Sequence, residues 1–148
     1  MEIVVPAWAI SIMAVLSGTL GAFAVQRFIA FRKASVKFRS TVLGILSGLY
    51  PIPAHWPDSG NAVDQALHAA FPALQTAVTE FRDSLPICRR GKFDQAWFIY
   101  RLGSEGRETD KQCYGQYMGF SSPDKVIPDS KVTFHVNVSR LLSFARKT

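Results

Sequence analysis

The sequence predicts an all-α protein: an N-terminal transmembrane helix that continues into a stalk and then a small helical domain. The first observation is the run from Ile3 to Val25, about 23 residues without a formal charge, which at about 1.5 Å per residue would cross a hydrocarbon core of about 30 Å. The second is that apolar residues recur every three or four positions in most later segments, the spacing of an amphipathic helix. The third is that no two segments alternate as paired strands would.

Two other interpretations of the uncharged run compete with a retained span. A cleaved signal peptide begins with a basic region and has a shorter apolar stretch, of about 7 to 15 residues, whereas only Met1 and Glu2 precede this run. The segment Ala22-Phe23-Ala24 nevertheless resembles a cleavage site. A core helix of a soluble domain would need a polar face, which the run lacks. A retained transmembrane helix is therefore the favoured interpretation.

The residues that follow the run predict its orientation. Five basic residues with no acidic residue among them come directly after it: Arg27, Arg32, Lys33, Lys37 and Arg39. By the positive-inside rule, the N-terminus lies outside and the C-terminal domain in the cytoplasm, in the cell inner membrane. We expect these five side chains to contact the anionic lipid headgroups of the bilayer.

The net charge of +6 is explained by where the basic residues lie. Between Ser40 and Ser139 nine basic residues face ten acidic ones, so the body of the domain is close to neutral. A nucleic-acid-binding domain would carry basic residues clustered on a folded face with aromatic side chains between them. The charge therefore indicates a membrane surface and argues against nucleic acid as a partner.

Small residues recur within the predicted span. Ala14, Gly18 and Ala22 follow the four-residue spacing that lets two helix backbones approach closely in lipid. They predict packing of the span against a membrane partner or a second copy. The alternative is that small residues are simply common in membrane helices.

The chain divides into four predicted segments. We expect a transmembrane anchor in residues 1–26, a basic juxtamembrane stalk helix in 27–49, a proline-rich connector in 50–60 and a helical cytoplasmic domain in 61–148. The apolar face of the stalk would pack on the domain, form a coiled coil with a second copy or lie on the bilayer. Packing on the domain is the preferred arrangement.

The first half of the domain predicts two helices. One runs from Asn61 to Leu85, where Pro72 either kinks the helix or divides it in two. The other runs from Cys88 to Leu102 and ends at Gly103.

The second half is less regular. A short helix is expected within Arg107 to Phe120 and an exposed loop from Ser121 to Ser130. Residues 131–138 alternate as a strand would, but they also fit a helix that begins at Asp129 or Ser130. We choose the helix because a single strand would have no partner.

No pattern in the sequence names a catalytic or metal-binding residue. The histidines His55, His68 and His135 have no ligand spacing with another histidine, cysteine or acidic residue, so we predict no metal site and no cofactor. The chain has no phosphate-binding glycine loop, no nucleophile elbow and no HExxH helix. Cys88 and Cys113 form no CxxC pair and are expected to be reduced in the cytoplasm.

Several phrases of the soluble part resemble a known group of proteins. They are LSGLYPIPAHWP, FPALQTAVTEFR, FDQAWFIYR, GRETDKQCYGQY and RLLSFA. They resemble an uncharacterised family of small bacterial single-pass membrane proteins. The resemblance implies a bacterial inner membrane and carries no activity, cofactor or site residue.

The favoured function is that of a single-pass membrane protein acting as a non-enzymatic, membrane-tethered interaction or assembly module. Its partner would be another protein or a second copy, and its possible partner surface combines four aromatic residues with one arginine: Trp97, Tyr100, Arg107, Tyr114 and Tyr117. Core packing is the other explanation for these rings. The alternative function is a membrane-anchored enzyme with a site in the Arg89 to Tyr117 region, where groups such as Arg89, Arg90, Arg107, Glu108, Asp110, Tyr114 and His135 would converge.

Overall fold

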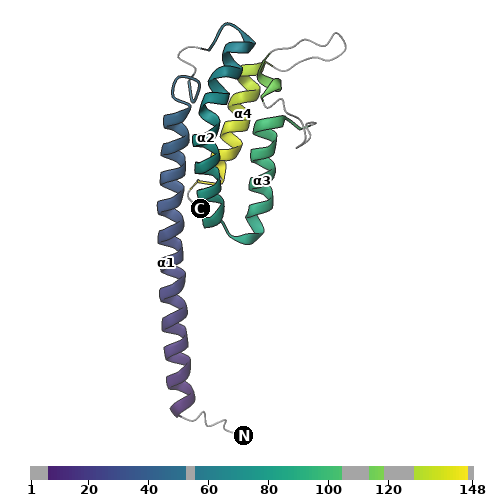
Figure 1. Cartoon of the computed structure of the whole chain (residues 1–148). Helices are drawn as coiled ribbons and strands as arrows, with labels where there is room; N and C mark the ends of the chain where they lie inside the picture. The colour runs from purple at the N-terminus through teal and green to yellow at the C-terminus, as the bar shows by residue number, and fades with distance from the viewer. Residues whose placement is uncertain (1–6, 53–55, 105–113, 119–128, 147–148) are drawn as a thin grey trace.

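The structure, a computed structural model, describes residues 7–52, 56–104, 114–118 and 129–146, and for residues 7–20 the backbone alone. Its elements are α1 (Ala7–Ile45), α2 (Gly60–Ser84), α3 (Ile87–Leu102), the short 3-10 helix η1 (Gly115–Tyr117) and α4 (Ser130–Ser143). All the regular structure in these ranges is helical, which confirms the all-α class. The α-helices run alternately up and down, so that α2, α3 and α4 form a bundle beside one half of α1 (Figure 1).

Helix α1 joins the predicted anchor to the predicted stalk without a break. Its C-terminal half lies along the bundle, whereas its N-terminal half projects beyond the bundle with no other element beside it (Figure 1). The face toward the bundle buries Phe38, Val42 and Leu46, each 2% exposed. The prediction that the stalk packs on the domain is therefore confirmed.

The predicted span itself lies mostly outside the residues whose side chains are described. Within the described part of the chain, no helix combines the length and the apolar character that crossing a membrane requires. Ala14 and Gly18, two of the three predicted packing residues, fall among the undescribed side chains, and Ala22 is exposed.

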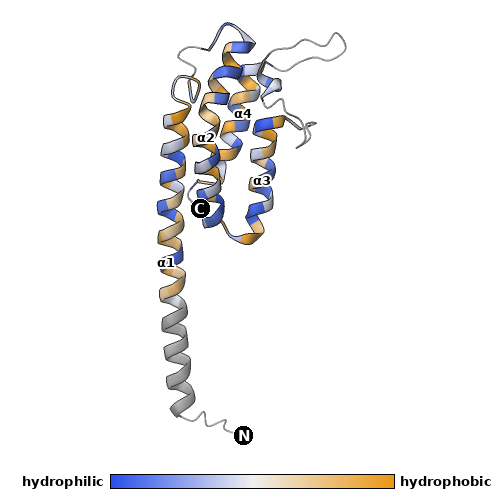
Figure 2. Cartoon of the chain, in the orientation of Figure 1, coloured by the Kyte–Doolittle hydropathy of each residue, from blue (hydrophilic) through white to orange (hydrophobic). Residues whose placement is uncertain are grey.

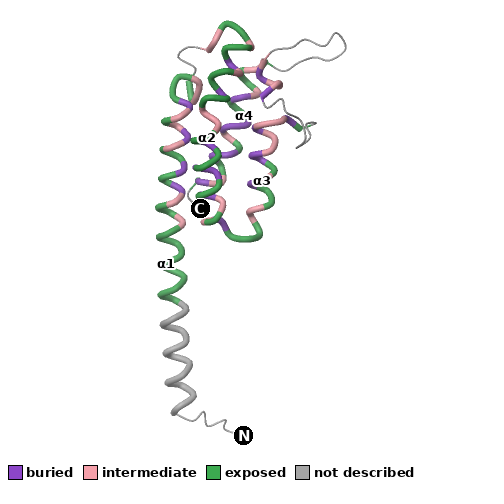
Figure 3. The backbone as a smooth tube through the Cα atoms, viewed as in Figure 1, coloured by how far each residue is buried: buried purple, intermediate pink, exposed green. Residues whose placement is uncertain are grey.

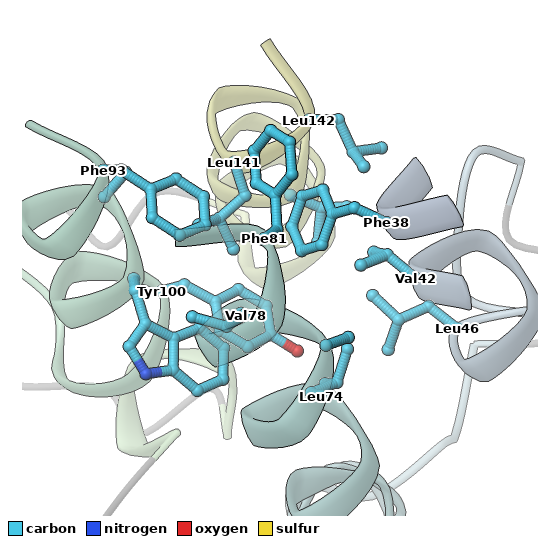
Figure 4. Close-up of a cluster of buried hydrophobic side chains, with 14 of the residues drawn as sticks. Phe38, Val42, Leu46, Leu74, Val78, Phe81, Phe93, Tyr100, Leu141 and Leu142 are labelled. Carbon is cyan, nitrogen blue, oxygen red and sulfur yellow. The ribbon is translucent and has the colours of Figure 1, made fainter. Parts of the chain in front are cut away.

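Aromatic rings from three helices form the centre of the core (Figure 4). Phe38 of α1 stacks on Phe81 of α2, with ring centroids 4.4 Å apart and planes 8° apart. Phe93 of α3 meets Phe81 edge to face at 5.4 Å. Such pairs add to the free energy gained from burying apolar area, and they join α1 to the domain.

Helix α2 is a single helix, which decides between the two predictions for Pro72. The proline lies within the helix on its exposed side. The helix begins where the side chain of Ser59 accepts a hydrogen bond from the backbone N–H of Ala62 at 3.3 Å, a normal N-cap.

Charged side chains join α2 to α3 across a short turn. Arg82 donates to both carboxylate oxygens of Asp94, at 2.7 and 2.9 Å, and this carboxylate raises the pKa of the arginine. Arg90 donates to the carbonyl oxygens of Leu85 and Asp83, at 3.0 and 2.9 Å, and so satisfies the last carbonyls of α2. Helix α3 ends at Gly103, as predicted, with φ 82°.

Helix α4 confirms the helical interpretation of residues 131–138. The side chain of Asp129 accepts from the backbone N–H of Lys131 at 2.9 Å and caps the helix. The helix buries Phe134 and Val138 but leaves Val132 and Val136 56% and 47% exposed, so the alternating residues do not share one face.

The remaining predictions concern the connector and the region after α3. Trp56 is half-buried, with its ring 5.4 Å from that of Phe134, so this part of the connector packs on the core. Most of the short helix predicted within Arg107 to Phe120 and of the loop predicted from Ser121 to Ser130 lies outside the described residues; η1 is the described helical part.

Candidate functional site

A groove between α1 and the end of the chain after α4 is the candidate site. Its volume is about 550 Å³, within the range of roughly 300–1,000 Å³ typical of small-molecule sites. It is lined by Phe28, Phe31, Arg32, Ser35, Val36, Arg39, Ala145 and Arg146. The lining thus combines apolar side chains, three guanidinium groups and one hydroxyl.

Helical spacing explains why these residues of α1 meet. Phe28, Arg32, Ser35 and Arg39 follow one another at steps of four, three and four, which places them on one face of the helix. Phe31 is fixed beside them because its ring lies 6.1 Å from the buried ring of Phe81.

The opposite wall of the groove comes from the end of the chain. Ala145 is 6% exposed, and its small side chain leaves room between the two walls. The exposed Arg146 follows it directly and adds a guanidinium group across from α1.

The charge of the groove is of one sign. Arg32, Arg39 and Arg146 are all exposed, and none of the described residues that line the groove is acidic. A cleft with one sign of charge beside low-dielectric walls concentrates the opposite ion. The planar guanidinium group also matches the paired oxygens of a phosphate or carboxylate. The groove therefore suits an anion attached to an apolar group.

Ser35 is the buried polar residue of the groove. It is 7% exposed, and its Oγ has no hydrogen-bond partner within the described chain. The neighbouring Ser40, by contrast, donates to the carbonyl oxygen of Lys37 at 2.9 Å. A buried hydroxyl without a partner costs about 1–3 kcal/mol of folding free energy. The wall of the groove thus contains a hydroxyl that is shielded from solvent and that the described protein groups do not use.

The wider surface around the groove is basic as well. In Figure 1 the α2–α3 turn and the end of the chain lie toward the projecting half of α1. The described basic residues of this half of the bundle and the adjoining α1 are Arg27, Arg32, Lys33, Lys37, Arg39, Arg82, Arg89, Arg90, Lys92, Arg140 and Arg146; the acidic ones are Glu80, Asp83 and Asp94. We call this surface the basic end. The opposite end carries three acidic residues, Asp58, Asp64 and Asp129, near the starts of α2 and α4, together with the basic residues Lys131 and Arg101.

The predicted headgroup residues do not all lie on the same side of α1. Arg27, Arg32, Lys33, Lys37 and Arg39 are all exposed on α1. Arg32 and Arg39 line the groove, whereas Lys37 pairs with Glu80 at 2.6 Å on another side of the helix. Sequence reasoning missed Arg146 as a member of this site because more than a hundred residues separate it from Arg39 along the chain.

The predicted aromatic partner surface needs correction. Trp97, Tyr100, Tyr114 and Tyr117 are 7%, 1%, 0% and 1% exposed, so these rings belong to the core, and Arg107 lies outside the described residues. The apolar stripe of α3 packs against α2, η1 and α4 and is covered by them. Burial raises the pKa of both the Tyr100 and the Tyr117 phenol.

The residues named for an enzymatic site do not converge where they are described. Arg89 and Tyr114 flank opposite ends of α3, a helix about 24 Å long. The Arg89 guanidinium lies 5.6 Å from the centre of the Phe144 ring, and the exposed His135 packs on Tyr50 with centroids 5.0 Å apart. Arg107, Glu108 and Asp110 lie outside the described residues. Among the residues described, no group of histidine, cysteine and acidic side chains is arranged to hold a metal ion.

Comparisons of the chain with protein-family models, curated proteins and solved structures found no match.

Proposed function

We propose that this protein is a single-pass membrane protein of a bacterial inner membrane, with its N-terminus outside and its helical bundle at the cytoplasmic surface as a non-enzymatic interaction or assembly module. The observation that carries the proposal is the bare N-terminal half of α1. Large apolar side chains are exposed there: Phe23 (61%), Val25 (58%), Phe28 (54%) and Ile29 (47%).

These side chains favour a lipid environment for the projecting helix. Residues 21–30 are exposed on every side of α1, and no other element of the bundle covers them (Figure 3). Apolar residues continue along α1 to the limit of the described side chains (Figure 2), next to the uncharged run that begins at Ile3. Burying one large apolar side chain is worth about 1.5–3 kcal/mol, so a bilayer around this half would stabilise the chain.

The charge of the basic end also supports placing the projecting half of α1 in the bilayer. Anionic headgroups attract lysine and arginine side chains that lie close to the cytoplasmic leaflet. The basic end faces the projecting half of α1, while the described acidic residues at the starts of α2 and α4 lie at the far end (Figure 1). With the projecting helix in the bilayer, the basic residues stand nearest its surface.

The proposed role as an interaction module rests on two parts that could hold a partner, the span and the bundle. The small residues Ala14, Gly18 and Ala22 provide spacing for helix packing in lipid, and a protein partner or a second copy would use it. Copurification in mild detergent, with the native span and with a polyleucine span, distinguishes a partner held by the span from one held by the bundle.

The exposed free thiol of Cys88 allows a direct test of the topology. In the full chain carrying Cys113→Ser, a membrane-impermeant maleimide is expected to label Cys88 only after spheroplasts are disrupted. In a Cys88→Ser/Cys113→Ser chain, Glu2→Cys provides the matched probe of the other side and is expected to react in intact spheroplasts. Labelling of Cys88 in intact spheroplasts, or recovery of the protein in the soluble fraction, would contradict the proposal.

A further inference from the structure

We infer that the groove between α1 and the end of the chain binds one molecule of an anionic phospholipid. The phosphate lies against the guanidinium groups of Arg39 and Arg146, and the acyl chain runs along Phe28 and Phe31 toward the projecting half of α1. The inference rests on the proposed function, because it names the membrane component that the bundle holds at the bilayer surface.

The order of the lining residues matches the order of groups in a phospholipid. Phe28 lies nearest the projecting half of α1, and Arg39 lies eleven residues further on, about 16 Å along the helix. The groove therefore leads from apolar rings beside the bilayer to cations away from it. Arg32, between them, reaches the same groove and adds a further donor near the headgroup.

Charge decides between the occupants that such a groove could take. A second copy that used the same face would bring arginine against arginine, which is repulsive. An apolar helix would leave the guanidinium groups and the Ser35 hydroxyl without acceptors. A phosphate ester with an acyl chain supplies acceptors to the polar groups and apolar area to the rings.

Ser35 provides the second, independent observation. Its side chain is more than nine-tenths buried, its hydroxyl has no partner within the described chain, and it lies between Arg32 and Arg39 on the groove face. A change in the χ1 rotamer of Ser35 turns this shielded hydroxyl toward the groove, where a phosphate oxygen supplies the acceptor that it lacks. A cationic surface that attracts lipid only by diffuse charge needs no such buried donor.

The test compares lipid binding to the full-length protein in mild detergent by native mass spectrometry. Phosphatidylglycerol is titrated against phosphatidylcholine with the same acyl chains, and we expect one retained phosphatidylglycerol, bound about tenfold more tightly. The variant pair Arg39→Gln/Arg146→Gln should lose this preference. The pair Arg27→Gln/Lys33→Gln removes the same charge from exposed residues of α1 that do not line the groove, and it should keep the preference.

Two further arms identify the parts of the ligand that are recognised. Ser35→Ala is expected to weaken the binding of both lipids several-fold, because both carry the phosphate oxygen that the hydroxyl would meet, and so to leave the preference for phosphatidylglycerol in place. Glycerophosphoglycerol, which has the headgroup but no acyl chains, is expected not to be retained. Far-UV circular dichroism of each variant checks that the helices are intact.

Four outcomes would overturn the inference. Equal loss in both charge pairs would show diffuse surface attraction, and equal binding of the two lipids would show an apolar groove without headgroup recognition. Retention of glycerophosphoglycerol at the same affinity would indicate a site for soluble phosphate esters. A protein dimer strengthened by Arg39→Gln/Arg146→Gln would assign the groove to a second copy. Failure of the proposed function is seen separately, in the Cys88 labelling and the membrane fractionation, because the lipid titration uses purified protein.

Discussion

The phenol of Tyr117 donates a hydrogen bond of 2.9 Å to the backbone carbonyl of Tyr100, and this bond joins η1 to the C-terminal part of α3. The same phenol accepts a bond of 3.0 Å from the side-chain amide of Asn137 on α4. One hydroxyl therefore connects η1, α3 and α4. The Tyr100 hydroxyl, by contrast, is buried and has no partner in the described chain.

Tyr117→Phe and Tyr100→Phe are expected to differ, although each removes one buried hydroxyl. Tyr117→Phe leaves the Asn137 amide without its acceptor and should lower the free energy of unfolding by about 1–3 kcal/mol. The Tyr100 carbonyl keeps its bond from Gln116, so the loss comes from Asn137 alone. Tyr100→Phe should be neutral or slightly stabilising. Urea unfolding of the full chain in mild detergent measures both, and equal effects would contradict the assignment.

The same tyrosines predict a loss of stability at alkaline pH. Burial raises the pKa of Tyr100 and of Tyr117, so above about pH 10 the unfolded chain releases protons that the folded chain keeps. Their contribution is complete below pH 10 and is lost as the pH rises toward the raised values, by about 1.4 kcal/mol per pH unit for each tyrosine. Tyr100→Phe should reduce the loss between pH 10 and 11 by about 1 kcal/mol, because the unfolded tyrosine is only half ionised at pH 10. An unchanged slope would mean that Tyr100 does not retain its proton in the fold.

Two glycines at different places should respond in opposite directions to alanine. A Cβ at Gly60, at the start of α2, would collide with the backbone carbonyl of Met118, so Gly60→Ala must displace η1 and should destabilise the fold by about 1–3 kcal/mol. Gly91 lies exposed within α3 with open space around it, and Gly91→Ala should stabilise the fold by about 0.5–1 kcal/mol. Thermal unfolding of the two variants in the same detergent tests the pair. A stabilised Gly60→Ala chain would refute the contact.

Phe38 is expected to contribute more than the nearby Val36 to the attachment of α1 to the domain. Phe38→Ala removes the ring that stacks on Phe81 and leaves a cavity, which should lower the free energy of unfolding by about 3–5 kcal/mol. Val36 lies two residues away but is 60% exposed, so Val36→Ala should change stability by less than about 0.5 kcal/mol. A small effect of Phe38→Ala would show that α1 is held elsewhere.

The helices of the domain were predictable because their apolar residues are periodic and their ends carry strong signals. In α2, Leu67, Leu74 and Phe81 recur at steps of seven, and all three are buried. Gly103 ends α3 through a positive φ that glycine adopts without strain. Periodicity alone did not say which rings of α3 face solvent, so the buried Tyr100 was assigned to a partner surface.

The groove was not predictable in the same way. Ser35 and Ser40 both lie on α1, yet Ser35 is buried and its hydroxyl has no partner in the described chain, whereas Ser40 is exposed and donates to Lys37, and this difference depends on tertiary packing. Arg146 belongs to the groove because α4 returns to α1, a long-range arrangement that no local pattern encodes. The sequence predicted a basic stretch, but only the fold shows that Arg32 and Arg39 of this stretch line a groove.

The unbroken course of α1 has a mechanical consequence. A helix of 39 residues is a rod about 58 Å long, and its backbone has no interruption at which anchor and bundle could bend independently. In the proposed placement, a tilt of about 20° in the bilayer moves the far end of such a rod sideways by about 20 Å. In that placement tilt adjusts to hydrocarbon thickness, so the rod would convert the thickness of the membrane into the lateral position and orientation of the bundle.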